Sequence, residues 1–181
     1  DSHETSNLLH TIGDFERISD HALNMMKVAK EIHDKKLKFS DEACSELENL
    51  KDALIEILEI TVDSFINNDL EEAKKLEPLE QVIDNLKSNI KKAHVARLKK
   101  GICTIETGFV LSDLITNCER VADHCSNIAV CLIQVADDSF DTHEYLNNVK
   151  SHGDEMFDKL YKAYKQKYGI TKSVKSAEPQ S

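Results

Sequence analysis

A nine-residue stretch occurs twice in this chain and restricts the possible folds more than any other feature. The stretch from Glu16 to Asn24 returns between Glu119 and Asn127, with Glu, Arg, Asp, His and Asn at identical offsets. Both copies lie in long segments with helical spacing of apolar residues. On a helix, residues four apart lie about 40° apart around the axis, so the Glu and Asp of each copy share one face.

The composition and the apolar spacing predict an all-α fold. The 181 residues include only five Gly and two Pro, and 40% are hydrophobic, so helix breakers are scarce. No segment alternates in the manner of a strand. Short connections between long helices favour an antiparallel bundle. We expect helices at about 6–34, 40–66, 70–99, 104–136 and 141–168, with a kink or a late start near Glu77 caused by Pro78.

The spacing of the two copies predicts the domain organisation. From Glu16 to Glu119 the distance is 103 residues, which corresponds to a repeating unit of three long helices. We predict that residues 1–34 form the last helix of a first unit and residues 40–136 form a complete second unit. Residues 141–169 then form an extra C-terminal helix, and residues 170–181 form a disordered tail.

Charge and cysteine content exclude several classes of protein. The formal net charge of −10 argues against nucleic-acid binding and against docking on an anionic membrane, and it suits a protein that collects cations. The five cysteines form no Cys-x-x-Cys pair, which indicates free thiols in a reducing cytosol. No apolar run is long enough to cross a bilayer and no signal peptide is visible. The chain lacks an initiator Met, so we expect it to be a piece of something longer.

Two of the predicted helices differ in their apolar surface. Helix 104–136 is apolar over most of its circumference, so we expect it in the middle of the bundle. Gly108 within it is expected to allow close approach of another helix. His21 and His124 directly follow the motif Asp residues and point about 100° away from them, so they fit helix packing as well as ligation. The first helix has a single apolar stripe: Leu8, Leu9, Ile12, Phe15, Ala22, Met26 and Ala29.

Acidic pairs on three of the predicted helices are candidate metal ligands. Helical bundles build polynuclear iron or manganese sites from carboxylates that converge from several helices, with histidines close by. Ordinary salt bridges on wet helix faces explain the same residues, and the spacing alone leaves both interpretations open. The candidate ligands are Glu16, Asp20, Glu80, Asp84, Glu119 and Asp123.

Three segments carry a resemblance to a known family. The segments HTIGDFERISDHALN at 10–24, LEPLEQVIDNLK at 76–87 and NCERVADHCSNIAVCLI at 117–133 resemble the PhoU family. Within it they are similar to the PhoU-like cytoplasmic domain of bacterial type-II-related sodium-phosphate cotransporters. The resemblance implies two three-helix repeats, the first truncated here. It also implies that four of the candidate acids fall on positions that hold iron or zinc-type clusters in some PhoU proteins, namely Glu16, Asp20, Glu119 and Asp123. Glu80 and Asp84 fall on a helix that supplies further acids in that family.

The resemblance leads to a functional expectation. We expect a cytosolic domain, at the cytoplasmic face of the inner membrane, that has no enzymatic activity and regulates sodium-dependent phosphate uptake. Its expected partners are the membrane-spanning part of the same transporter, a second copy of the chain, and phosphate. The expected cofactor is iron, zinc or another divalent or trivalent metal.

Three alternatives remain open at this stage. One is a free-standing PhoU-type regulator that contacts an ABC phosphate transporter and a sensor kinase. Another is a carboxylate-bridged metalloenzyme of ferritin-like type, which normally uses Glu-x-x-His on paired helices, a spacing that neither copy contains. The third is a helical scaffold that self-associates through the core left exposed by a truncated first repeat.

Overall fold

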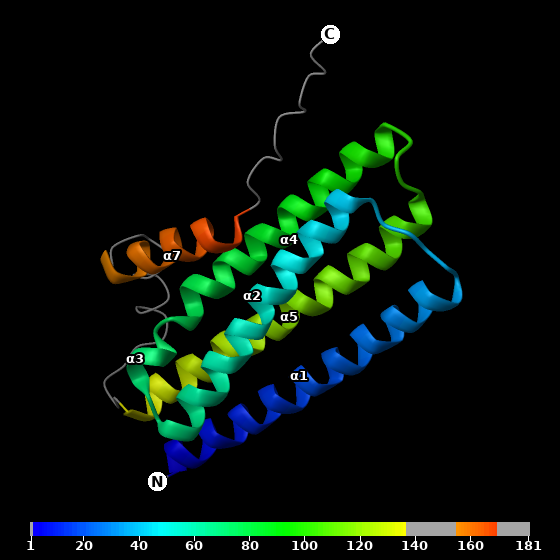
Figure 1. Cartoon of the computed structure of the whole chain (residues 1–181). Helices are drawn as coiled ribbons and strands as arrows, with labels where there is room; N and C mark the ends of the chain where they lie inside the picture. Colours follow the sequence, from blue (N-terminus) through cyan, green and yellow to red (C-terminus); the bar gives the residue numbers. More distant parts are fainter. Residues whose placement is uncertain (1, 137–154, 170–181) are drawn as a thin grey trace.

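The computed structural model of this chain describes residues 2–136 and 155–169, and within them every regular element is a helix (Figure 1). The predicted all-α class is therefore confirmed. The helices are α1 (Ser2–Asp34), α2 (Asp41–Asn67), α3 (Leu70–Ala73), α4 (Leu76–Lys99), α5 (Ile105–Ala136) and α7 (Glu155–Tyr168).

The helix α5 lies at the centre of the bundle, as its apolar circumference predicted. It packs against α1 on one side and against α2 and α4 on the other (Figure 1). Leu111, Ile115 and Ile128 are each at most 1% exposed, because neighbouring helices cover α5 from several directions. The antiparallel arrangement of the long helices follows from their short connections.

Local sequence signals define the helix ends. The Ser40 hydroxyl caps α2 by accepting a hydrogen bond from the backbone N–H of Ala43 at 3.3 Å. Asn68 then adopts a left-handed conformation, with φ of 50°, at the end of the same helix. Asp69 accepts two backbone N–H hydrogen bonds at the start of α3. Gly101 turns the chain after α4 with φ of 68°, a conformation that glycine adopts without strain.

The segment expected to be helical at 70–99 forms two helices. The segment is divided into α3 and α4, and Pro78 lies in the first turn of α4, where its missing N–H leaves no helical hydrogen bond unmade. The late start expected near Glu77 is confirmed, since α4 begins at Leu76.

The C-terminal predictions are only partly within the described residues. The helix expected at 141–168 corresponds to α7 over Glu155–Tyr168, while residues 141–154 and the predicted tail at 170–181 lie outside the described residues. The assignment of the chain to repeat units stays a prediction. Among the described residues, no helix is both long enough and apolar enough to span a bilayer.

Most of the apolar stripe of α1 lies outside the core, although Phe15 packs against it. Leu8, Leu9, Ile12 and Met26 are all exposed. The face of α1 that is buried instead contains Thr11, and it packs mainly on α5. The physical reason is that the described helices lie on one side of α1, so its opposite side is exposed among the described residues.

Close contacts join the other helices. The carboxylate of Glu46 on α2 accepts two hydrogen bonds of 2.8 Å from the guanidinium of Arg97 on α4, and both side chains are buried. The expected close approach at Gly108 is confirmed, because a Cβ atom there would lie 2.5 Å from Nε2 of His94. These two contacts fix the position of α4 against α2 and against the start of α5.

Candidate functional site

The two copies of the motif meet where α1 crosses α5. Nδ1 of His124 lies 2.8 Å from Oδ1 of Asp14, and Nδ1 of His21 lies 2.8 Å from Oδ1 of Asn117. Asp14 and Asn117 are themselves 103 positions apart, as are the two histidines. The same contact is therefore made twice, once in each direction, and the two antiparallel helices are related by an approximate two-fold axis.

These contacts decide what the motif histidines do. Each ring bonds to a side chain on the opposite helix, and His124 is buried. Asn127, at the end of the second copy, donates to the same Asp14 carboxylate at 3.4 Å. The histidines therefore pack α1 against α5, which is the first of the two roles that their spacing had left open.

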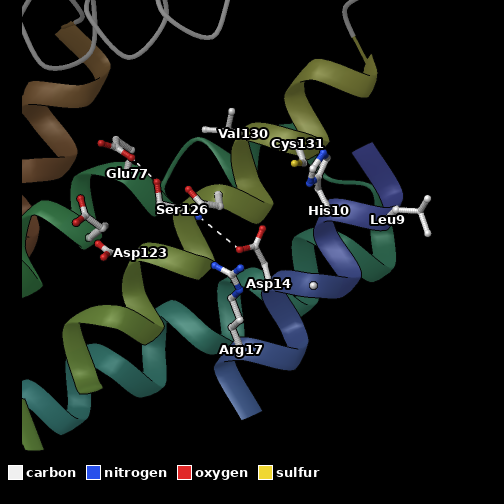
Figure 2. Close-up of a pocket in the computed structure, with 12 residues that line it drawn as sticks. Leu9, His10, Asp14, Arg17, Glu77, Asp123, Ser126, Val130 and Cys131 are labelled. Atoms are coloured by element: carbon white, nitrogen blue, oxygen red, sulfur yellow. Dashed lines mark hydrogen bonds between the residues drawn. The ribbon is translucent and has the colours of Figure 1, made fainter. Parts of the chain in front are cut away.

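An open pocket of about 630 Å³ lies beside this crossing, between α1, α4 and α5 (Figure 2). Its polar lining includes Asp14 and Arg17 from α1, Glu77 and Glu80 from α4, and Asp123 from α5. Four of these five side chains are acidic, so the pocket concentrates negative charge in a partly enclosed space.

Two acids of the pocket, Glu80 and Asp123, have raised pKa values. Glu77 is 6% exposed and accepts a hydrogen bond from the Ser126 hydroxyl, and the two side chains face each other in Figure 2. Glu80 and Asp123 share a hydrogen bond, which requires a proton on one of the two carboxyl groups. Burial, and then the charges of Glu77, Asp123 and Asp84, raise the pKa of Glu80 from 4.5 to about 8. The pKa of Asp123 is raised as well, by burial and then by Glu119.

Of the six predicted ligands, the structure brings only Glu80 and Asp123 into direct contact. Glu119 instead forms an ion pair with Nζ of Lys87, across α5 and α4. Asp84 is exposed on α4. Glu16 and Asp20 are exposed on α1. No described helix lies over them in the way that α4 lies over the second copy.

The six predicted ligands do not converge into one cluster in the structure. Over residues 2–136 and 155–169, no group of three or more His, Cys, Asp or Glu side chains is placed to hold a metal ion. Glu80 and Asp123 both line the acidic pocket, and they supply the carboxylate oxygens that hard cations prefer. Metal binding at the six positions stays a prediction.

Sequence reasoning missed the partners of the two histidines. Asp14 and Asn117 lie just before the nine-residue stretch, and one is acidic while the other is an amide. Extending the comparison of the two copies by two residues upstream would have aligned them. Arg17 and Ser126 were also not recognised as pocket residues, because no residue pattern indicates which motif side chains face α4.

The fold and the site define an all-helical bundle protein built around an internally repeated helix. Residues 47–132, from α2 to near the end of α5, match the PhoU domain family. The chain is also 26% identical over 144 residues to a Thermotoga maritima protein, the phosphate-specific transport system accessory protein PhoU homolog 1. That alignment covers 80% of this chain, and the chain spans 61% of the relative's length. No solved structure matches the chain.

Residues 47–132 are therefore similar to a PhoU domain, and the chain as a whole is similar to a PhoU protein. The PhoU part of the resemblance found in the sequence is confirmed. The narrower likeness to a domain of sodium-phosphate cotransporters stays a prediction, since the relative is an accessory protein of a phosphate-specific transport system.

Proposed function

We propose that this chain is a regulatory module of phosphate transport that acts as a PhoU-type accessory protein and not as an enzyme. The observation that carries the proposal is the homology, over 80% of the chain, to an accessory protein of a phosphate-specific transport system. This homology favours the alternative of a free-standing regulator over the cotransporter domain that we first expected.

The use of the polar side chains supports a non-catalytic role. His21 and His124, the residues of the motif best suited to acid–base chemistry, are engaged between α1 and α5. The polar contact at Asp14 also borders the acidic pocket, so a change of charge in the pocket acts on the attachment of α1. In this proposal, α1 transmits the state of the pocket to the transport machinery.

Measurement of phosphate uptake tests the proposed function. The chain is expressed in bacterial cells that lack their own PhoU protein, and the initial rate of phosphate uptake is measured at low and high external phosphate. We expect the chain to change the rate at one of the two concentrations. The variant His124→Ala should lose the effect, whereas Glu59→Gln, at an exposed site on α2, should retain it. Folded chain that leaves uptake unchanged at both concentrations would contradict the proposal.

A second candidate is the cytoplasmic domain of a sodium-phosphate cotransporter, bound to the membrane-spanning part of that transporter. It is favoured by the sequence of the second motif copy. The segment Asp123-His-Cys-Ser-Asn-Ile128 resembles the branch of the PhoU family that is linked to cotransporters. The two candidates differ in the sodium dependence of the uptake that the chain alters. An effect confined to uptake in the presence of sodium would select the cotransporter.

The proposal also includes two separate hypotheses, namely that the chain binds a metal ion and that it binds phosphate. A bound cation would give anionic phosphate a favourable partner on a chain with a net charge of −10. Equilibrium dialysis with radiolabelled inorganic phosphate, on protein loaded with iron or zinc and on chelated protein, measures both. Equal weak binding in the two samples would remove phosphate binding from the proposal.

A further inference from the structure

The corner of the bundle where α4 ends and α5 begins differs in charge from the rest of the chain. Residues 91–109 contain five cationic side chains and one acid, whereas the whole chain has a net charge of −10. No Asp or Glu occurs from residue 85 to residue 105. The net charge therefore disfavours an anionic surface as a partner for the chain as a whole, but not for this corner.

Most of the positive charge of the corner is exposed. The guanidinium of Arg97 is the exception, since it is buried in its ion pair with Glu46. Glu106, the one acid of the corner, pairs with Lys35 of α1 at 3.0 Å. The other cationic side chains are exposed, and no ion pair joins them to an acid in the part of the chain that the structure describes. These side chains are Lys91, Lys92, Lys99 and Lys100.

Large apolar side chains are exposed among these four lysines. Phe109 is 70% exposed, Ile105 is 66% exposed and Ile102 is 56% exposed. Val95 of α4 is exposed as well, and together with Ile105 and Phe109 of α5 it lines an open hollow of about 230 Å³. Single exposed apolar residues are ordinary, but several that gather around one hollow indicate an interaction surface.

The internal repeat does not explain these apolar residues. The equivalents of Ile105 and Phe109 in the first copy, 103 positions earlier, are Ser2 and Ser6. The repeated contact between α1 and α5 therefore does not require apolar side chains at these positions. The corner lies at the end of the bundle that is remote from the start of α1 (Figure 1). Its apolar residues are thus a feature of this corner and not of the repeat.

We propose that this corner, defined by its four exposed lysines and by Val95, Ile102, Ile105 and Phe109, binds the surface of an anionic lipid bilayer. The apolar side chains enter the boundary between head groups and acyl chains, and the lysine ammonium groups bind lipid phosphates. The flexible stems of the lysines let their charged ends reach the head groups while the apolar side chains lie deeper. This binding is a property of the chain itself and does not depend on a role in phosphate transport.

A bilayer fits this corner better than a partner protein does. A stable protein interface buries roughly 800 Å² on each side and requires a matching shape. The corner offers one small hollow and a few apolar side chains between flexible lysines. An anionic bilayer supplies phosphate groups and apolar chains together, and it adapts to the residues that enter it. The combination of charge and exposed apolar surface therefore favours lipid.

Sedimentation with lipid vesicles tests the proposal on the full chain. Vesicles of phosphatidylglycerol mixed with phosphatidylcholine present anionic head groups, and vesicles of phosphatidylcholine alone are the neutral comparison. We expect the chain to bind the anionic vesicles at least roughly tenfold more tightly than the neutral ones. Most of this binding should be lost when the salt concentration rises from roughly 0.05 M to roughly 0.5 M, because salt screens the attraction between lysines and phosphates.

Matched variants separate binding through the corner from unspecific contact. The double variant Lys99→Glu with Lys100→Glu should weaken binding to anionic vesicles at least roughly tenfold. Phe109→Ser, which introduces the residue that the first copy has, should weaken binding by about tenfold through the loss of apolar burial. Ile66→Ser is the control, because Ile66 is 72% exposed near the end of α2, at the opposite end of the bundle, and it should bind like the native chain. Circular dichroism checks that each variant remains helical.

A tryptophan reporter gives an independent measurement. The chain contains no Trp, so Phe109→Trp introduces a single indole into the corner. Its fluorescence emission should move to shorter wavelength on addition of anionic vesicles, whereas that of Ile66→Trp should not move. Equal shifts for the two variants would overturn the proposal, because the chain would then have no preferred face towards the lipid.

Two further outcomes would overturn the proposal. One is a native chain that does not bind anionic vesicles at low salt. The other is binding that the double variant Lys99→Glu with Lys100→Glu leaves unchanged. A chain that ignores the vesicles but binds a synthetic amphipathic helix with a Glu-rich polar face would assign the corner to an acidic protein partner instead of a bilayer.

Discussion

The imidazole rings of His21 and His124 stack on each other between α1 and α5, with their centroids 5.6 Å apart and their planes inclined by 27°. Residues 103 positions apart in the sequence thus meet at the approximate two-fold axis that relates the two motif copies. The two stacked rings occupy equivalent positions in the two copies. His21 bonds to Asn117 and His124 bonds to Asp14, and these two partners also occupy equivalent positions. The repeated motif therefore forms a self-complementary contact between α1 and α5.

Removing one ring of this stack should weaken the attachment of α1. We expect His124→Ala to lower the free energy of unfolding by about 2 kcal/mol, because it leaves the partly buried Asp14 carboxylate without its main partner. His21→Ala should cost less, about 1 kcal/mol, because its partner, Asn117, is neutral. Chemical denaturation measures both values. Equal losses would show that stacking, and not the polar contact, dominates.

The close approach at Gly108 predicts opposite effects for two glycine substitutions. Gly108→Ala should destabilise the protein by about 1–2 kcal/mol, because its Cβ would lie 2.5 Å from Nε2 of the buried His94. Gly13→Ala is the matched control, since nothing lies within 4 Å of a Cβ at that helical position. It should stabilise by about 0.5–1 kcal/mol through the higher helix propensity of alanine. Thermal unfolding of the two variants provides the comparison, and stabilisation by both would contradict the assigned packing.

The buried ion pair of Glu46 and Arg97 should behave as a unit. Glu46→Leu alone is expected to cost about 3–5 kcal/mol, because it leaves the guanidinium of Arg97 buried and unpaired. The double variant Glu46→Leu with Arg97→Met should recover most of that loss, because no buried charge remains. A double-mutant cycle in urea measures the coupling. Additive losses would mean that the two groups do not depend on each other.

The helices were more predictable from the sequence than the site was. The caps at Ser40 and Asp69 and the left-handed stop at Gly101 depend on neighbouring residues, which is why the predicted ranges end close to the observed helix ends. The exposure of Ile12 did not follow, because its surroundings depend on which helices are present and not on its own spacing. Helical periodicity shows which residues share a face, but the neighbour of that face is a tertiary property.

The acidic pairs illustrate the same limit. Glu16 and Glu119 have matching sequence contexts, yet the structure exposes the first and pairs the second with Lys87. The repeat predicted their common helical geometry, whereas the side chain opposite each of them comes from a distant part of the chain. The contact between Glu80 and Asp123 likewise joins two helices whose relative rotation the sequence pattern does not specify.

The protonated Glu80 predicts a decline in stability as the pH rises. Its pKa is 4.5 in an ordinary environment and about 8 in the folded protein, so between these values the unfolded chain releases a proton that the folded chain retains. This group therefore favours the folded state most below about pH 4.5, and its contribution is lost progressively up to about pH 8. Glu80→Gln, which is neutral at every pH, should lack this decline and should be more stable than the native chain at pH 8–9, by an amount on the order of 1–2 kcal/mol.

Urea unfolding at pH 5, 7 and 9 measures this difference, with Glu59→Gln as the matched control at an exposed site on α2. The stability difference between Glu80→Gln and the native chain should grow with pH, whereas the difference for Glu59→Gln should stay nearly constant. Parallel profiles for all three proteins would mean that Glu80 is ionised in the folded state at neutral pH. The shared proton between Glu80 and Asp123 would then be absent, and two adjacent carboxylates in a partly buried pocket would require a cation to balance their charge.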